Sequence, residues 1–212
     1  MTVTEDLVLL LKKCSECALD VERNIAEPGK DLRTMCFWNI HNRVMLTEEI
    51  MYMYGRLWET PQFRDLDSEE SSEITERIVM VTKDMFIDVV SSVEKTMKDS
   101  LKFHTQSGLK EVALRNTSHL YMRNILVGAV EKGLMDKKTF EEWDLIMTIR
   151  NLAAHNNSIA DRQGRFEIGG IELSMRPGRM MKGPLNTYVV LTERLVSLFY
   201  DWLSMLKRNF SS

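Results

Sequence analysis

The sequence predicts an all-α fold, a helical bundle of about six helices with a small β-hairpin inserted before the last helix. Three observations support this fold class. The 212 residues include only ten glycines and four prolines, which leaves few places where a helix must end. Along most of the chain apolar residues recur every three or four positions, the period of an amphipathic helix. In one segment, residues 165–175, apolar and polar residues instead alternate, as in a strand.

Residues 1–70 are predicted to form an N-terminal helical extension. A first helix follows the apolar positions from Leu7 to Ile25 and stops before a Pro-Gly pair. Asp31 is placed to cap a second helix that runs to about Trp58. The acidic, serine-rich residues 65–72 are expected to form a polar linker to the rest of the chain.

Residues 71–212 are predicted to form the bundle itself. Its first helix, Ile74 to about Phe103, is the longest in the chain. A fourth helix of the protein is expected from Leu109 to Glu131, with Gly133 as its C-terminal stop. A fifth helix is expected to begin after the capping residue Asp136.

The C-terminal quarter contains the predicted hairpin and the last helix. Residues 165–175 alternate apolar and polar side chains around Gly169 and Gly170, a pair that suits a two-residue hairpin turn. A basic loop is expected to follow at residues 176–184. The chain then ends in an amphipathic helix from Thr187 to Lys207.

The charge distribution bears on the kind of partner. A net charge of -3 argues against a surface dedicated to duplex nucleic acid. Between residues 145 and 185, however, six basic residues stand against three acids. The bases are Arg150, Arg162, Arg165, Arg176, Arg179 and Lys182. This segment could follow the phosphates of an anionic substrate, or it could be a solvated surface without a ligand.

Cysteine use and hydropathy indicate a cytoplasmic protein that does not enter a membrane. Three cysteines, an odd number without a signal peptide, favour a reducing compartment, and no apolar run is long enough to span a bilayer. Cys14 and Cys17 form a C-x-x-C pair within a helical pattern. With Cys36 and His41 they could make a zinc site, but buried thiols on an apolar face are the favoured interpretation, so no metal or other cofactor is expected.

The segment Arg150-Asn151-Leu152-Ala153-Ala154-His155 carries the candidate chemistry. Arginine is a permanent, bidentate phosphate binder, and histidine can accept and donate a proton near neutral pH. In an ideal helix Arg150 and His155 lie about 140° apart, so one helix aims them poorly at a common point. The small residues between them would let a second helix approach closely. A site shared by two copies of this helix is therefore easier to assemble than one within a single copy.

A purely structural role for the same residues stays open. Arg150 could form an ion pair with Glu142 or Asp144, and His155 could be a C-terminal helix residue stabilised by the helix dipole. The segment 115–119, Arg-Asn-Thr-Ser-His, begins in the same way but has only three residues between Arg and His. It is expected early in the fourth helix and is interpreted as structural.

The order of elements from Ile74 to Phe210, with the Arg-Asn-x-x-x-His motif at 150–155 and the following Asn156 and Asn157, resembles the HEPN superfamily. The N-terminal extension has no counterpart in that resemblance. The resemblance implies a metal-independent endoribonuclease that acts as a homodimer through the motif helix, and a role as a toxin or in defence. It implies Arg150, Asn151 and His155 as catalytic residues. The residues expected to bind RNA are Asn156, Asn157, Arg162, Arg165, Arg176, Arg179 and Lys182.

The resemblance also assigns roles. His155 would act as the general base on the ribose 2′-hydroxyl or as the acid that protonates the leaving 5′-oxygen, giving a 2′,3′-cyclic phosphate end. Arg150 would stabilise the charge that develops on the phosphorus oxygens. Asn151 would orient His155 or bond the phosphate. The need for a 2′-hydroxyl makes RNA, and not DNA, the expected substrate.

Two other functions remain as alternatives. A non-catalytic HEPN-like module would bind a nucleotide, RNA or a protein, with an antitoxin or a nucleotidyltransferase among the possible partners. A structural helical protein would instead act through the N-terminal extension. The apolar positions expected to be exposed for that role are Met51, Met53, Tyr54 and Trp58.

Overall fold

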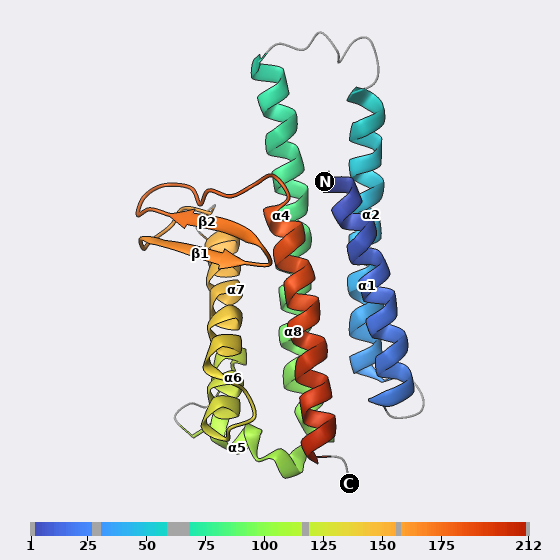
Figure 1. Ribbon diagram of the computed structural model, residues 1–212, viewed down its shortest axis with the longest axis vertical. Coiled ribbons are helices and arrows are strands. Elements are labelled where there is room, and N and C mark those ends of the chain that lie inside the picture. Colours follow the sequence, from blue (N-terminus) through green and yellow to red (C-terminus); the bar gives the residue numbers. More distant parts are fainter. Residues whose placement is uncertain (1–2, 27–30, 59–67, 116–118, 156–157, 211–212) are drawn as a thin grey trace.

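The computed structural model describes residues 3–26, 31–58, 68–115, 119–155 and 158–210. Figure 1 shows long helices arranged in three layers. The first layer holds α1 (Val3–Asn24) and α2 (Leu32–Trp58), and the central layer holds α4 (Ser68–Ser100) and α8 (Thr187–Phe210). The third layer holds α6 (Met122–Glu131) and α7 (Lys137–His155), with strands β1 (Gly164–Ile168) and β2 (Ile171–Met175) across one end of α7. Short helical segments connect α4 to α6: two 3₁₀ turns, Leu101–Phe103 and Thr105–Ser107, and α5 (Leu109–Ala113).

The predicted fold class is confirmed. Every long element of the described residues is a helix, and the single hairpin precedes α8. In the hairpin, antiparallel pairing runs from Gly164 opposite Met175 to Ile168 opposite Ile171. The Gly-Gly turn has φ values of 59° and 78°, both in the left-handed region that a two-residue hairpin turn requires. Among the described helices, none combines the length and apolarity that crossing a bilayer needs.

The predicted continuous helix from Leu109 to Glu131 is wrong. Helix α5 ends at Ala113 and α6 begins only at Met122. Arg115 and His119 are consequently exposed beside the connection, where Arg115 forms an ion pair with Glu131 at 3.5 Å. The intervening sequence is rich in Asn, Thr and Ser, whose side chains compete for backbone hydrogen bonds and favour turns over helix interiors.

One buried apolar cluster unites the N-terminal helices with the rest of the chain. The rings of Phe37 in α2 and Phe199 in α8 lie 5.1 Å apart between centroids, a contact that adds about 1 kcal/mol to simple burial. The hydroxyl of Tyr200 in α8 donates to Asp20 in α1 at 2.6 Å. The N-terminal helices thus share a core with α4 and α8, and a domain boundary at residue 70 stays a prediction.

The cysteines lie in this core as apolar residues. Cys14 and Cys36 are buried, and Cys17 is partly buried. Burial raises the pKa of Cys14 and of Cys36 to about 12 and that of Cys17 to about 11. Among the described residues, no three His, Cys, Asp or Glu side chains are grouped as the ligands of a metal ion would be.

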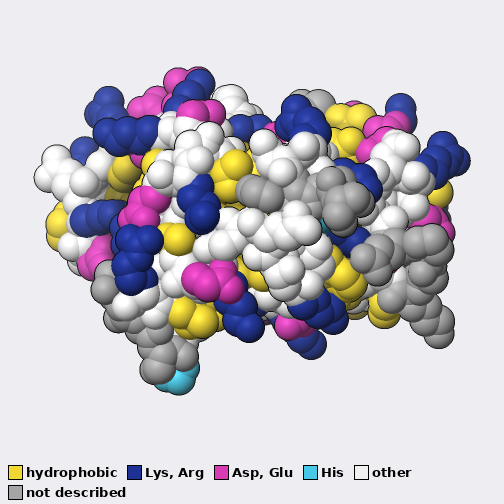
Figure 2. Space-filling model, turned by 90° about the horizontal axis from the view of Figure 1, so that it is seen from below, with side chains coloured by type: hydrophobic (Ala, Val, Ile, Leu, Met, Phe, Trp, Pro, Cys, Tyr) yellow, Lys and Arg dark blue, Asp and Glu magenta, His cyan; other side chains and the backbone are white. Residues whose placement is uncertain are grey.

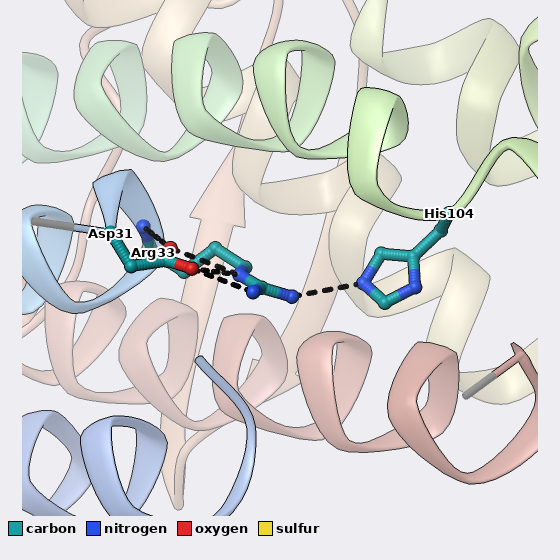
Figure 3. A network of polar contacts seen from close by, with 3 residues as sticks. All are labelled: Asp31, Arg33 and His104. Carbon is teal, nitrogen blue, oxygen red and sulfur yellow. Dashed lines mark hydrogen bonds and ion pairs between the residues drawn. The ribbon is translucent and has the colours of Figure 1, made fainter. Parts of the chain in front are cut away.

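A buried polar network joins the start of α2 to the chain after α4 (Figure 3). The guanidinium of Arg33, which is 2% exposed, pairs with Asp31 at 2.6 Å and stacks on Phe103. It also lies 3.1 Å from Nε2 of His104. Because a guanidinium only donates, Nε2 must accept, and the imidazole is neutral with its proton on Nδ1. Burial, and next the charge of Arg33, lower the pKa of His104 to about 4.

Candidate functional site

Helix α7 is anchored at both ends. At its start, Asp136 accepts hydrogen bonds from the backbone N–H of Thr139 at 2.8 Å and from its hydroxyl at 3.0 Å. Beyond its end, Ser158 adopts a φ of 63° and its N–H donates to the carbonyl of Leu152. The side chain of Ser158 is buried and shares a 2.9 Å hydrogen bond with the hydroxyl of Tyr188 in α8. These contacts place the end of α7 against the central layer and the hairpin.

Two adjoining hollows run along the C-terminal half of α7. The first, about 680 Å³, lies between α4, α6 and α7, and the second leads from it past the end of α7. Both are lined by Thr148, Asn151 and Arg162, so they form one continuous depression. We call it the α7 groove. Its charged and polar residues are Glu94, Arg123, Asp144, Thr148, Arg150, Asn151, His155, Asp161 and Arg162.

Arg150 is half-buried in the wall of the α7 groove and held in position. Its Nη1 donates to Oδ1 of Asn151 at 3.0 Å, and its Nη2 donates to Oγ of Ser91 in α4 at 3.2 Å. The Ser91 hydroxyl in turn donates to the carbonyl of Ile87 at 2.9 Å, which fixes the oxygen that Arg150 uses. The guanidinium is therefore oriented by neutral oxygens from two different helices.

The expected ion pair of Arg150 with Glu142 or Asp144 is not formed. Asp144 pairs with Arg123 at 2.8 Å, and Glu142 accepts from Nε of Arg194 at 2.6 Å. Within the described ranges no carboxylate forms an ion pair with Arg150. The positive charge at the groove wall is thus left without a neutralising partner from α7.

His155 lies in the last turn of α7 and is exposed. Among the described side chains, none forms a hydrogen bond with its ring. Arg150 lines the first hollow and His155 the second, with Asn151 lining both between them. The side-chain oxygen of Asn151 accepts from Arg150, which leaves its amide N–H groups for a ligand in the groove.

The other residues expected to bind substrate are only partly brought together. Arg162 lines the α7 groove, where its Nη2 donates to the hydroxyl of Thr148 at 2.5 Å. Arg165 is exposed on β1 and lies in a neighbouring hollow that Arg162 also lines. Asn156 and Asn157 lie outside the described residues.

The remaining three bases lie on the loop after β2, away from the lining of the groove. Arg176, Arg179 and Lys182 are exposed. Backbone hydrogen bonds hold this loop in place: the N–H of Ala160 donates to the carbonyl of Arg179, and Ser174 and Lys182 exchange N–H and carbonyl bonds. These bases could meet a long substrate but do not line the groove.

Sequence reasoning missed Ser91, Thr148 and Arg123. Ser91 is 59 positions from Arg150, in the middle of a long helix, and nothing in its local sequence marks it. Figure 2, a view from below the bundle, shows Lys and Arg side chains interspersed with Asp and Glu over that end of the molecule. The α7 groove is also mixed in charge, so the site is recognised by its local contacts and not by a large basic patch. Its lining includes three arginines, Arg123, Arg150 and Arg162, and three acids, Glu94, Asp144 and Asp161.

No protein-family model, no curated protein and no solved structure matches the chain. The resemblance to the HEPN superfamily accordingly rests on the motif and on the order of elements alone.

Proposed function

We propose that the protein is a metal-independent endoribonuclease of the HEPN type that acts as a homodimer. The observation that carries the proposal is the guanidinium of Arg150, which is fixed by Asn151 and Ser91 and has no ion-pairing carboxylate among the described residues. It lines a groove at whose other end the exposed imidazole of His155 is available for proton transfer.

In this mechanism the ribose 2′-oxygen attacks the adjacent phosphorus, and the bond from phosphorus to the 5′-oxygen breaks. One histidine removes the 2′-proton and a second donates a proton to the leaving 5′-oxygen, so the products are a 2′,3′-cyclic phosphate and a 5′-hydroxyl. Arg150 stabilises the charge on the non-bridging oxygens, a contribution of about 10² to 10³ in rate for one well-placed donor. An N–H of Asn151 provides a further hydrogen bond to the same phosphate.

A homodimer supplies the second histidine. Helix α7 lies at the edge of the bundle, on the side opposite α1 and α2 (Figure 1). Its exposed face near the motif carries Asn151, Ala154 and His155. The small Ala154 side chain allows close approach of a second α7. Two such helices meeting there would bring both copies of Arg150 and His155 to one cleft.

A second candidate function is a non-catalytic module that binds a nucleotide, RNA or a protein such as an antitoxin or a nucleotidyltransferase. The contacts of Arg150 are compatible with it. Two nitrogens of the Arg150 guanidinium already donate to protein oxygens, which suits a fixed anion-binding position as well as a catalytic one. Binding of RNA without cleavage would support this alternative.

Cleavage of a labelled single-stranded RNA in the presence of EDTA tests the proposal. The wild type should cut and leave cyclic phosphate ends, while Arg150→Ala and His155→Ala should each lose at least about 100-fold in rate. Arg115→Ala and His119→Ala are matched controls, because this exposed pair mimics the motif but does not line the groove. Activity that survives both motif substitutions, or that EDTA abolishes, contradicts the mechanism.

A further inference from the structure

Helix α2 is apolar on two opposite faces. One face is buried in the core, through residues such as Phe37, Ile40 and Val44. The other carries a row of large apolar side chains that are between 37% and 65% exposed. They are Met35, Trp38, Met45, Leu46, Tyr52 and Met53. A contiguous row of large apolar side chains on a surface commonly marks an interaction site, so this second face is expected to be covered in the working protein.

The exposed row has the spacing of a helix-packing seam. Trp38, Met45 and Tyr52 are seven residues apart, as are Leu46 and Met53. With side chains of roughly 200 Å² each, the exposed fractions leave about 600 Å² of surface on these residues, at the upper end of the largest apolar patch that a monomer commonly exposes. The amount approaches the roughly 800 Å² that each partner contributes to a standard interface.

We propose that a second copy of the same chain covers this row, with the two α2 helices antiparallel and a two-fold axis between Met45 and Leu46. Four of the six apolar positions, Trp38, Met45, Leu46 and Met53, are evenly placed about that midpoint, while Met35 and Tyr52 lie towards the two ends of the row. In this register Met45 meets Leu46 of the other copy, and Trp38 meets Met53 of the other copy. The four symmetric positions therefore pack apolar against apolar, as a two-fold interface between identical surfaces requires.

Two polar residues on the same face of α2 have the same symmetry. Asn42 and Glu49, both exposed, interrupt the apolar positions at equal distances from the midpoint. The antiparallel register places the Asn42 amide beside the Glu49 carboxylate of the other copy, where it can donate a hydrogen bond. A parallel pair would instead set the two Glu49 carboxylates against each other. The polar positions thus favour the antiparallel arrangement over the parallel one.

This interface is independent of the proposed nuclease dimer. Figure 1 shows α2 in the layer at the opposite edge of the bundle from α7. Both edges can therefore be occupied at once, and loss of one contact leaves the other intact.

The solution mass of the full chain, measured by sedimentation or light scattering, tests the proposal. Met45→Glu and Leu46→Glu place charges at the axis and should reduce the mass, to that of an α7 dimer if one forms and to a single chain otherwise. Leu185→Glu, at a residue of similar exposure before α8, is the matched control and should leave the mass unchanged. Circular dichroism and melting curves establish that each variant is folded, and RNA cleavage per chain should be unaffected.

Cross-linking tests the register. With a short bismaleimide, Trp38→Cys and Met53→Cys should each fail to link with themselves and should link when the two variants are mixed. Linking of Trp38→Cys with itself contradicts the antiparallel arrangement. If neither glutamate substitution changes the mass, the proposal is wrong. The row is then expected to bind a different protein.

Discussion

Acidification should destabilise the fold through His104. The pKa of this imidazole falls from its usual 6.5 to about 4 in the folded protein, first because it is buried and next because Arg33 lies beside it. Since the folded-state pKa lies below the unfolded-state value, the stability that His104 contributes is present above pH 6.5 and is lost as the pH falls from 6.5 towards 4. His104 is only 5% exposed, so solvent screens the effect little.

The magnitude follows from this difference in pKa. Between pH 7 and pH 5 the unfolded chain protonates this histidine almost fully and the folded chain hardly at all, which removes about 2 kcal/mol from the free energy of unfolding. Carboxylates elsewhere also change stability in this range. A comparison with His104→Gln isolates the histidine, because Gln does not titrate and its side-chain oxygen can still accept from Arg33.

Urea unfolding of both proteins at pH 7, 6 and 5 measures the effect. The wild type should lose about 2 kcal/mol more than His104→Gln over this interval. His119→Gln, at an exposed histidine, should follow the wild type. A difference between wild type and His104→Gln that stays constant with pH refutes the assignment of a neutral, buried His104.

Three further predictions concern the site and the hairpin. Ser91→Ala removes one of the acceptors that hold Arg150, so kcat for RNA cleavage should fall about tenfold with KM little changed. Gly169→Ala should cost at least about 1 kcal/mol more than Gly170→Ala in urea unfolding. Both positions have positive φ, but only at Gly169 would a new Cβ lie 2.6 Å from Val190. RNA affinity, measured by titration, should fall about tenfold or more from low to physiological salt if the basic segment follows phosphates, and a salt-independent affinity contradicts that role.

Periodicity predicted most of the long helices and the hairpin. The positions of α1, α7, α8 and the hairpin follow from apolar residues at intervals of three and four or of two, because burial itself imposes these intervals. The break between α5 and α6 escaped the same reasoning, since apolar residues continue at helical intervals across it. The cluster Asn116-Thr117-Ser118 was the available signal, as three residues that compete for backbone hydrogen bonds.

The partners of Arg150 show which part of a site a local sequence can predict. Asn151 is its neighbour in the chain, but Ser91 comes from another helix and becomes a partner only through packing. The expected pairing with Asp144 fails on helix geometry. Residues six apart lie about 120° apart around a helix, whereas paired charges are three or four residues apart. Arg123, which enters from α6, pairs with Asp144 instead.

For helix α2, the sequence alone could not show which apolar residues face the core. Phe37, Val44 and Met51 form one row at intervals of seven, and the row that starts one residue later, at Trp38, has the same intervals and the same apolar character. The two rows differ by only about 100° around the helix. Local pattern therefore could not show which row faces the core, and the expectation that Met51 is exposed was wrong, since it is 4% exposed while Met53 is 65% exposed. Such ambiguity arises only when a helix has a second apolar face, and that second face is the one that the antiparallel pairing of α2 would bury.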